Sequence, residues 1–554
     1  MSKNLSRHTK CFKIFLLYLC IYLPIQIKAQ IPNQPKLVIG IVVDQMRYDY
    51  LFKFWNKYSD KGFKRLVREG FLCRDAHYNY MPTYTGPGHA SIYTGATPSI
   101  HGIIANDWYE KNEKNEIYCV SDKNYETVGS TGKAGRMSPK NLQSSTIGDE
   151  LRLWSNFKSK VIGISLKDRA AILPAGRAAN AAFWFDATSG NFISSTYYMS
   201  QLPEWVSLFN QKKYADKYLS QAWNTLLPIS SYVESSDDNS KYENPYKGEK
   251  TPTFPHDLAA IKVNDGELIR RTPFGNSILK DFAISCINAE KLGKGNFPDF
   301  LSISFSSTDY IGHQFGPSSI ELEDTYLRLD QDISELLSFL DSYIGQNNIL
   351  FFLTADHGGV YSGTQLDSAK LSNGNTDFKS IKSQLEQALE NKYGKKESDW
   401  IASISNYQVF LNHALLISNN IPYSEFENFI VQYIEKLPGI ARCYTEAEMR
   451  IPQNGLAANI QRGFYPKRSG DIIILTEPYY GELFSKGAMH STTYTYDTHV
   501  PIILFGGAIP SGESYNYLEI TDIAPTICNI LGIEAPSGCT GKIINLKRVN
   551  STNR

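Results

Sequence analysis

The 554-residue sequence lacks an excess of charge of either sign. It contains 56 Lys and Arg residues against 56 Asp and Glu residues, so its formal net charge is zero. A protein that binds nucleic acid or an anionic membrane surface electrostatically needs a basic face. The composition therefore gives no reason to expect either as a partner.

The sequence also lacks a second long hydrophobic run. Residues 14–27 are the only apolar stretch near bilayer length, and they follow a basic segment, are broken by Pro24 and precede Ala29. This order is typical of a secretory signal peptide, and the short, broken run disfavours a permanent anchor. We predict a signal peptide over residues 1–29, a catalytic domain over residues 30–554, and an exported protein, periplasmic or secreted, without a stable membrane anchor after cleavage.

Cysteine pairs with metal-binding spacing are absent as well. Two of the eight cysteines, Cys11 and Cys20, fall in the predicted signal peptide, and no Cys-x-x-Cys occurs. The other six are therefore expected to be structural, and their disulfide pairing stays open: Cys73, Cys119, Cys286, Cys443, Cys528 and Cys539.

Continuous apolar runs, by contrast, recur along the chain. Such runs are typical of strands buried on both faces of a parallel sheet, and they cover residues 36–43, 161–165, 300–305, 349–353 and 500–505. Helical patterns lie between or after them, at residues 318–344, 380–393, 423–437 and 520–531. The alternation predicts an α/β fold with a mostly parallel central sheet and helices on both faces. Polar segments suggest two cap insertions, at about residues 170–296 and 360–469.

Chemically capable residues follow four of these runs. Asp44, Lys167, Asp309 and Asp356 each come shortly after a predicted strand. In open α/β sheets, ligands bind beyond the carboxyl ends of the strands, so we expect these side chains at one edge.

Asp and His residues form short groups in these segments. Asp309 and His313 are four residues apart, which places them on one face of a helix. Asp356 and His357 are adjacent and precede two glycines that permit a sharp turn. His490 lies further on. One Asp or His in a loop is usually solvated, but several such groups after separate strands favour Zn²⁺, which accepts mixed nitrogen and oxygen ligands.

A threonine stands at a Gly-Pro-Gly turn. Thr85 precedes Gly86-Pro87-Gly88, and a run compatible with a helix follows. This arrangement can present one hydroxyl at a helix N-terminus, where free N–H groups favour an anion. Taken alone, the segment is best interpreted as an ordinary surface turn. The Asp and His groups elsewhere in the chain favour a functional role for it. Thr83 is the rival hydroxyl.

Taken together, these motifs resemble the alkaline phosphatase superfamily, and most closely the exported phosphate monoesterases of the PafA type, which have a threonine nucleophile. The similarity runs from about residue 36 to residue 546, and the insertions carry little of it. The matching segments are Val-Val-Asp44-Gln-Met-Arg, Thr85-Gly-Pro-Gly-His, Asn106, Lys167-x-Arg169, Asp309-x-x-x-His313, Asp356-His357-Gly and His490.

The resemblance implies a zinc-dependent alkaline phosphatase that forms a covalent phosphothreonine on Thr85. It implies two Zn²⁺ per chain, one held by Asp309, His313 and His490. The other would be held by Asp44, Asp356, His357 and the Thr85 oxygen.

Phosphate binding is assigned to Asn106, Lys167 and Arg169. Lys167 and Arg169 are two residues apart, so in an extended segment both point to one face. Two fixed cations favour a dianionic monoester over a diester, and small-molecule phosphate monoesters are the expected substrates. Ser491 stands where relatives more often have glycine, and His499 is expected outside the ligand set. His89 and His101 are expected to be structural.

Two alternatives differ in chemistry. A phosphodiesterase or nucleotide pyrophosphatase on the same two-zinc scaffold would cleave a diester faster than a monoester. An inert phosphate- or glycan-binding surface protein would keep the fold without turnover, which the intact Thr85 and ligand set disfavour. A sulfatase is disfavoured because no Cys-x-Pro-x-Arg segment occupies the turn. The oligomeric state and the natural substrate stay open.

Overall fold

The structure, a computed structural model, describes residues 34–263, 267–482 and 485–547. The predicted signal peptide, residues 1–29, lies outside this part of the chain. Within it, no helix is long and apolar enough to cross a bilayer. The six cysteines there are all free thiols.

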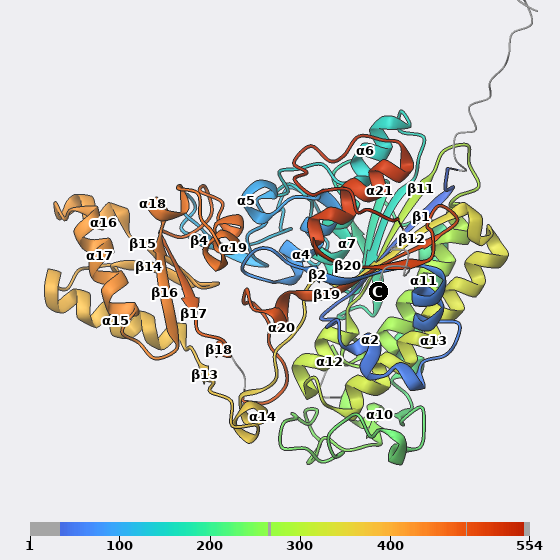
Figure 1. The fold of residues 1–554 in the computed structure, drawn as a ribbon, viewed down its shortest axis with the longest axis horizontal. Helices are drawn as coiled ribbons and strands as arrows, with labels where there is room; N and C mark the ends of the chain where they lie inside the picture. Colours follow the sequence, from blue (N-terminus) through green and yellow to red (C-terminus); the bar gives the residue numbers. More distant parts are fainter. Residues whose placement is uncertain (1–33, 264–266, 483–484, 548–554) are drawn as a thin grey trace, which may run out of the picture.

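A ten-stranded mixed sheet lies at the centre of the molecule (Figure 1). From one edge to the other its strands are β20 (Gly512–Glu519), β2 (Phe71–His77), β19 (His499–Gly506), β12 (Ile349–Thr354), β1 (Leu37–Val43), β11 (Asp299–Phe305), β6 (Val161–Ser165), β7 (Ala181–Asp186), β8 (Asn191–Ser195) and β5 (Thr127–Val128). The five strands from β12 to β7 are mutually parallel. Every residue of β1, β11 and β12 is buried, as a sheet covered on both faces requires. The predicted α/β class is confirmed.

Helices cover the two faces of the sheet in separate layers (Figure 1). One layer contains α4 (Thr85–Thr94), α6 (Ile147–Trp154), α7 (Asp168–Ala175) and α21 (Ile523–Leu531). The other contains α3 (Phe63–Glu69), α11 (Phe274–Glu290), α12 (Ser307–Phe315) and α13 (Ile320–Tyr343). The expected helix at residues 318–344 corresponds to α13, and the one at 520–531 to α21 with the preceding turn.

One strand runs against the expected direction. β19 pairs antiparallel with both β12 and β2. Its first residue, His499, therefore lies at the edge where the parallel strands end, and its glycines lie at the opposite edge. A continuous apolar run indicates that a strand is buried on both faces but does not indicate its direction. The sequence pattern therefore could not distinguish a parallel strand from an antiparallel one.

The first expected insertion, residues 170–296, is only partly outside the sheet. It contributes β7 and β8 to the sheet, and α11 packs against α13. The rest contains short elements, namely α8 (Glu204–Gln211), α9 (Tyr214–Tyr218), β9 (Ala222–Trp223), β10 (His256–Asp257) and α10 (Leu258–Lys262).

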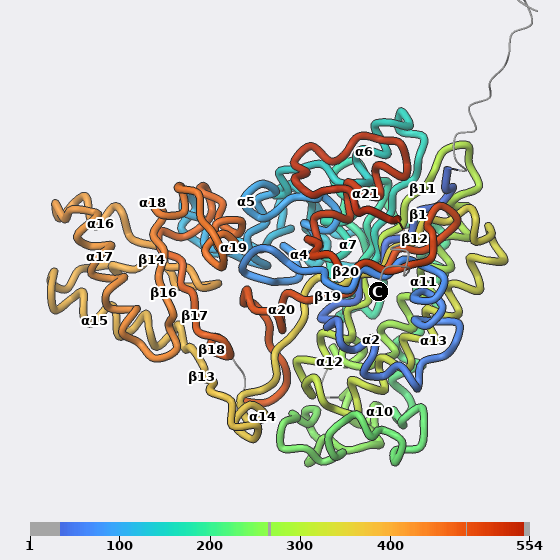
Figure 2. The backbone as a smooth tube through the Cα atoms, viewed as in Figure 1, coloured from blue at the N-terminus to red at the C-terminus, as the bar shows by residue number. Residues whose placement is uncertain are grey.

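The second expected insertion, residues 360–469, forms most of a lobe with its own hydrophobic core (left in Figures 1 and 2). Its antiparallel sheet has the order β14 (Ile401–Ser405), β15 (Gln408–Leu411), β17 (Ile472–Thr476) and β16 (Ile440–Thr445). Its helices include α15 (Phe378–Tyr393), α16 (His413–Ser418), α17 (Tyr423–Ile434), α18 (Glu446–Met449) and α19 (Leu456–Gly463). Because β17 belongs to this sheet, the lobe extends to residue 476.

The remaining elements are short. The helices are α2 (Tyr50–Lys53), α5 (Pro98–His101), α14 (Gly363–Ser368) and α20 (Thr495–Thr498). The strand pairs are β3 (Asp107–Glu110) with β4 (Asn115–Tyr118), and β13 (Gly374–Asn375) with β18 (Tyr480–Gly481).

Candidate functional site

The polar residues that follow the parallel strands meet at one edge of the sheet. Asp44 follows β1, Lys167 follows β6 and Asp356 follows β12. Asp309 lies in the first turn of α12, directly after β11. Side chains from the segments that follow four parallel strands therefore converge beyond the carboxyl ends of these strands, where such sheets bind ligands.

Thr85 is the first residue of α4 and is buried in this region. The helix approaches β12 closely because Gly88 has no side chain: a Cβ there would lie 2.3 Å from the Asp356 carbonyl oxygen. The rival hydroxyl of Thr83 donates to the Thr492 carbonyl oxygen, 2.9 Å away. Thr83 is thus engaged in the backbone framework, whereas Thr85 stands at the helix N-terminus.

Three of the expected ligands form one buried cluster. His357 Nε2 lies 3.5 Å from Asp44 Oδ1 and 3.6 Å from Asp356 Oδ2. None of these three atoms has a hydrogen-bond partner among the described residues. Buried polar atoms are almost always paired, so three orphan ligand atoms facing each other indicate a place for a cation.

The other three expected ligands form a second group around Asp309. Its Oδ1 atom lies 3.1 Å from His313 Nε2 and 3.7 Å from His490 Nε2. The two groups are contiguous, because the rings of His357 and His490 stack with centroids 3.5 Å apart. Asp309, His357 and His490 also place one ligand atom each within 4.8 Å of one another. All six residues therefore form one contiguous cluster, and His357 belongs to both groups of closely spaced ligand atoms.

The three imidazoles are oriented in the same way. Each directs its Nδ1 to a backbone carbonyl oxygen: His313 to Ala488, His357 to Gly358 and His490 to Thr83, at 2.7–2.9 Å. Donation from Nδ1 fixes the neutral tautomer that has a lone pair on Nε2. Metal-binding histidines characteristically have such a partner on the second ring nitrogen.

Lys167 lies between the two carboxylate groups. Its Nζ is 2.6 Å from both Asp44 Oδ2 and Asp309 Oδ2. Asp44 and Asp309 thus each direct Oδ1 to an imidazole and Oδ2 to the ammonium group. The ion pairs leave Asp44 Oδ1 without a hydrogen-bond partner among the described residues, whereas Asp309 Oδ1 also accepts from Gln45 Nε2. An ammonium group has three donors, so Lys167 keeps one N–H beyond these two contacts.

Arg169 contacts Thr85, and Asn106 contacts the next residue, Gly86. Arg169 Nη2 is 3.5 Å from Thr85 Oγ1. The Asn106 side-chain oxygen accepts from the Gly86 N–H at 2.8 Å, which leaves its NH₂ group as a donor. The expectation that Lys167 and Arg169 share an extended segment is wrong: Lys167 is the N-cap of α7 and Arg169 lies in its first turn.

Burial and close contact shift the pKa values of the clustered groups. Burial, together with Asp309 and Asp356, raises the pKa of Asp44 well above its usual value. Burial likewise raises the pKa of Asp356 to about 7. Burial and its neighbouring histidines hold the pKa of His490 well below its usual value. The three carboxylates and three imidazoles of this cluster offer both oxygen and nitrogen ligands, a mixed set that suits zinc better than magnesium or calcium.

Sequence reasoning missed some residues that support this site. Gln45 donates from Nε2 to Asp309 Oδ1 at 2.8 Å and from its backbone N–H to Asp356 Oδ1 at 3.2 Å. Asp497 accepts from the backbone N–H groups of Ser491 and Thr492, next to His490. Ser491 has φ +153°, a region that favours glycine. Gln45 directly follows Asp44, but its residue type alone does not predict hydrogen bonds to the carboxylates of Asp309 and Asp356.

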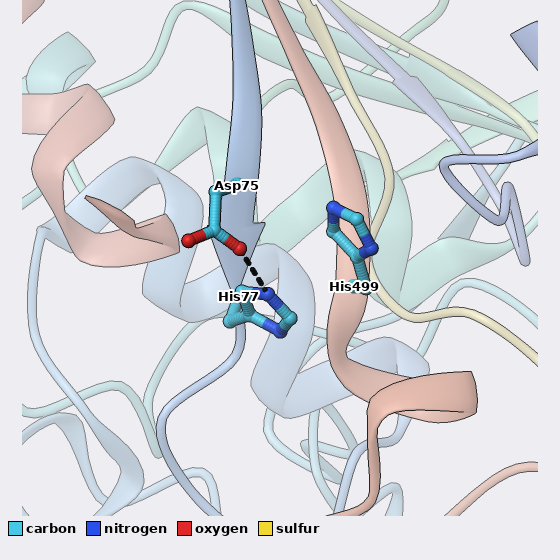
Figure 3. Close-up of side chains that lie close together, drawn as sticks. All are labelled: Asp75, His77 and His499. Carbon is cyan, nitrogen blue, oxygen red and sulfur yellow. Dashed lines mark hydrogen bonds and ion pairs between the residues drawn. The ribbon is translucent and has the colours of Figure 1, made fainter. Parts of the chain in front are cut away.

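A further group, Asp75, His77 and His499, is of a different kind (Figure 3). His77 Nε2 is bonded to Asp75 at 2.9 Å, and His499 Nε2 to the Arg74 carbonyl oxygen at 2.9 Å. The two rings stack with centroids 4.5 Å apart, so their lone pairs lie in nearly parallel planes. These side chains are partly exposed and already paired. His499 is the first residue of β19 and groups with Asp75 and His77 rather than with the six predicted ligands.

His89 and His101 are buried and bonded to the protein. His89 bonds the Thr85 carbonyl oxygen and Ser304 Oγ, both at 2.8 Å. His101 bonds Ser91 Oγ at 3.0 Å and the Ile103 N–H at 3.1 Å. His89 therefore ties α4 to β11, and His101 ties α4 to the turn after α5.

Comparisons with known proteins find similar sequences over most of the chain. The model of a family described as type I phosphodiesterase/nucleotide pyrophosphatase matches residues 38–492. The chain is 43% identical to alkaline phosphatase PafA of Elizabethkingia meningoseptica over 523 residues, covering 93% of this chain and 95% of the relative. It is 43% identical to alkaline phosphatase PhoV of Synechococcus elongatus, covering 92% of each chain. It is 46% identical to a Myroides odoratus protein named calcium-transporting ATPase, covering 92% and 94%.

Solved structures show the same similarity. A crystal structure of PafA superposes with a TM-score of 0.89 at 43% identity, covering 92% of this chain and 98% of that one. Murine ectonucleotide pyrophosphatase/phosphodiesterase 5 superposes with a TM-score of 0.50 at 14% identity, covering 90% and 96%. The second likeness concerns the fold alone.

Proposed function

Because the chain belongs to the type I phosphodiesterase/nucleotide pyrophosphatase family, within the alkaline phosphatase superfamily, we propose that it is a zinc-dependent phosphatase that hydrolyses phosphate monoesters through a phosphothreonine on Thr85. It is a phosphoric monoester hydrolase by its similarity to PafA and PhoV over most of each chain. The zinc, the covalent intermediate and export to the periplasm are our inferences.

The proposal rests on three buried ligand atoms without hydrogen-bond partners among the described residues, and on Thr85 at the N-terminus of α4. The three atoms are Asp44 Oδ1, Asp356 Oδ2 and His357 Nε2. Asp44, Asp356 and His357 would hold one ion with Thr85, and Asp309, His313 and His490 the other. Two zinc ions at these positions would supply positive charge to the attacking and leaving oxygens of phosphoryl transfer.

The chain's own residues would then orient the ester. The N-terminus of α4 favours an anion next to Thr85. Arg169, Asn106 and the remaining N–H of Lys167 would bind the phosphate oxygens, with Thr85 Oγ1 placed to attack phosphorus. The substrates would be small-molecule phosphate monoesters, because the charge around the site suits a dianion.

The test is phosphoryl labelling. We expect the zinc-loaded protein, quenched in acid during turnover of a ³²P-labelled aryl phosphate, to carry label on Thr85. Thr85→Ala is expected to lose the label and lower turnover on the order of 10⁴-fold or more, since it removes the nucleophile. Metal analysis of Thr85→Ala serves as the control and should still give about two zinc per chain. Label that persists in Thr85→Ala would exclude Thr85, and a wild-type chain that binds no zinc would exclude the two-ion site.

A further inference from the structure

The Arg169 guanidinium group is held in an unusual way. It is part of a buried site, yet among the described residues it forms no ion pair with a carboxylate, and its Nε has no hydrogen-bond partner. Its one strong contact is from Nη1 to the Tyr118 hydroxyl oxygen at 3.0 Å. A partly buried guanidinium group that keeps unpaired donors is available to an anionic ligand.

Tyr118 is in turn held by Asp168. The Tyr118 hydroxyl donates to Asp168 Oδ1, and the same oxygen accepts from the Arg169 backbone N–H at 2.6 Å. Burial raises the pKa of Tyr118 well above its usual value, so the phenol stays protonated and can donate and accept together. Asp168 therefore fixes the phenol, and the phenol fixes the guanidinium group.

The hairpin that carries Tyr118 is tied to the nucleophile as well. Tyr118 ends β4, and the next residue, Cys119, donates its N–H to the Asn106 carbonyl oxygen at 2.8 Å. Asn106 accepts from Gly86, next to Thr85. Tyr118, Asn106 and Thr85 thus belong to one hydrogen-bonded frame.

From this arrangement we propose that Tyr118, held by Asp168, is a positioning residue that sets Arg169 against the bound phosphate and thereby contributes to the preference for monoesters. The inference rests on the proposed function. A neutral phenol holds the guanidinium group by a hydrogen bond and leaves its positive charge unpaired. Direct pairing with a carboxylate would instead occupy the N–H donors that a phosphate needs. A diester has fewer charged oxygens for Arg169, so it depends less on this positioning.

The experiment removes only the hydroxyl group of Tyr118. In Tyr118→Phe, we expect kcat/KM for an aryl phosphate monoester to fall about tenfold, the size of a lost hydrogen bond to a charged group. The matched diester is expected to change less than about twofold. The dissociation constant of inorganic phosphate, measured by calorimetry on zinc-loaded protein, is expected to rise by a similar factor of about ten. This binding readout is informative even if turnover is absent.

A double-mutant cycle tests whether Tyr118 acts through Arg169. Adding Tyr118→Phe to Arg169→Ala is expected to cost no further monoester activity. Tyr109→Phe removes a hydroxyl from the same hairpin and is the matched control, expected to match wild type. The proposal would be overturned if Tyr118→Phe left phosphate binding unchanged, or if it lowered kcat/KM equally for the monoester and the diester. It would also be overturned if Tyr118→Phe caused the same loss of monoester activity in the Arg169→Ala background. A wild-type protein that binds phosphate but hydrolyses no monoester would instead overturn the proposed function.

Discussion

At the residue scale, the candidate site depends on which atom of each side chain faces which neighbour. Asp44 and Asp309 present one oxygen to an imidazole and the other to Lys167. The residue types could be read from the sequence because Asp and His follow buried strands. The assignment of atoms could not, since it follows from rotamers set by packing. For the same reason, the bridging role of Gln45 had no signal in the sequence.

Replacement of Arg169 is the first prediction at this scale. Arg169→Ala is expected to lower kcat/KM for an aryl phosphate monoester by about 10²-fold, since it removes a charge-assisted contact to the phosphate. The loss for the matched diester is expected to be much smaller. Arg169→Lys keeps the charge but not the planar fork, so an intermediate value is expected. Equal losses on both substrates, in steady-state assays, would remove the argument that these cations select monoesters.

Acid stability is the second prediction. Burial, with Arg468 nearby, lowers the pKa of His101 to about 3, so the unfolded state binds a proton there that the folded state excludes. The contribution of His101 is therefore complete above its unfolded pKa and is lost as the pH falls from about 6.5 towards 3.

This loss is expected to be about 2 kcal/mol between pH 7 and pH 5. In urea denaturation, the stability difference between wild type and His101→Gln should be smaller at pH 5 than at pH 7. A difference that stays constant, or grows, on acidification would contradict a neutral buried His101.

At the scale of elements, the position of α4 is decided by its contact with the segment after β12. The sequence indicated a turn at Gly86-Pro87-Gly88 and a short helical run; the helix in fact begins at Thr85 and ends at Thr94. Similarly, α7 begins directly after Lys167. Boundaries of this kind depend on tertiary contacts more than on local propensity, so periodicity alone did not find them.

Gly88→Ala tests this element. The added Cβ would meet backbone atoms of Asp356 at 2.3 Å, so the helix or the Asp356 loop must move. We expect a loss of about 1–3 kcal/mol in the free energy of unfolding, typical of overpacking, and a clear fall in zinc affinity. Thermal unfolding and zinc titration measure the two effects. Gly132→Ala is the matched control, since its backbone is not left-handed and the nearest atom to an added Cβ, Ser130 Oγ, lies 3.9 Å away. Wild-type zinc affinity in Gly88→Ala would show that this close approach is unimportant for the site.

At the scale of the whole molecule, the sequence predicted the class of fold better than its topology. Five apolar runs marked buried strands, and the motifs between them led to the superfamily. The pairing of β7 and β8 with the sheet was not predicted, because these strands lie in a segment read as an insertion. Strand order depends on contacts between residues far apart in sequence. The lobe formed mostly by residues 360–469 has its own hydrophobic core, which the sequence pattern did not predict.

The most direct test of the central claim is a pair of initial rates, on an aryl phosphate monoester and on a diester with the same leaving group, before and after chelation. We predict that the monoester is hydrolysed much faster, that a chelator abolishes both activities, and that added Zn²⁺ restores them. A faster rate on the diester, or full monoester activity in protein shown to be free of metal, would contradict the account.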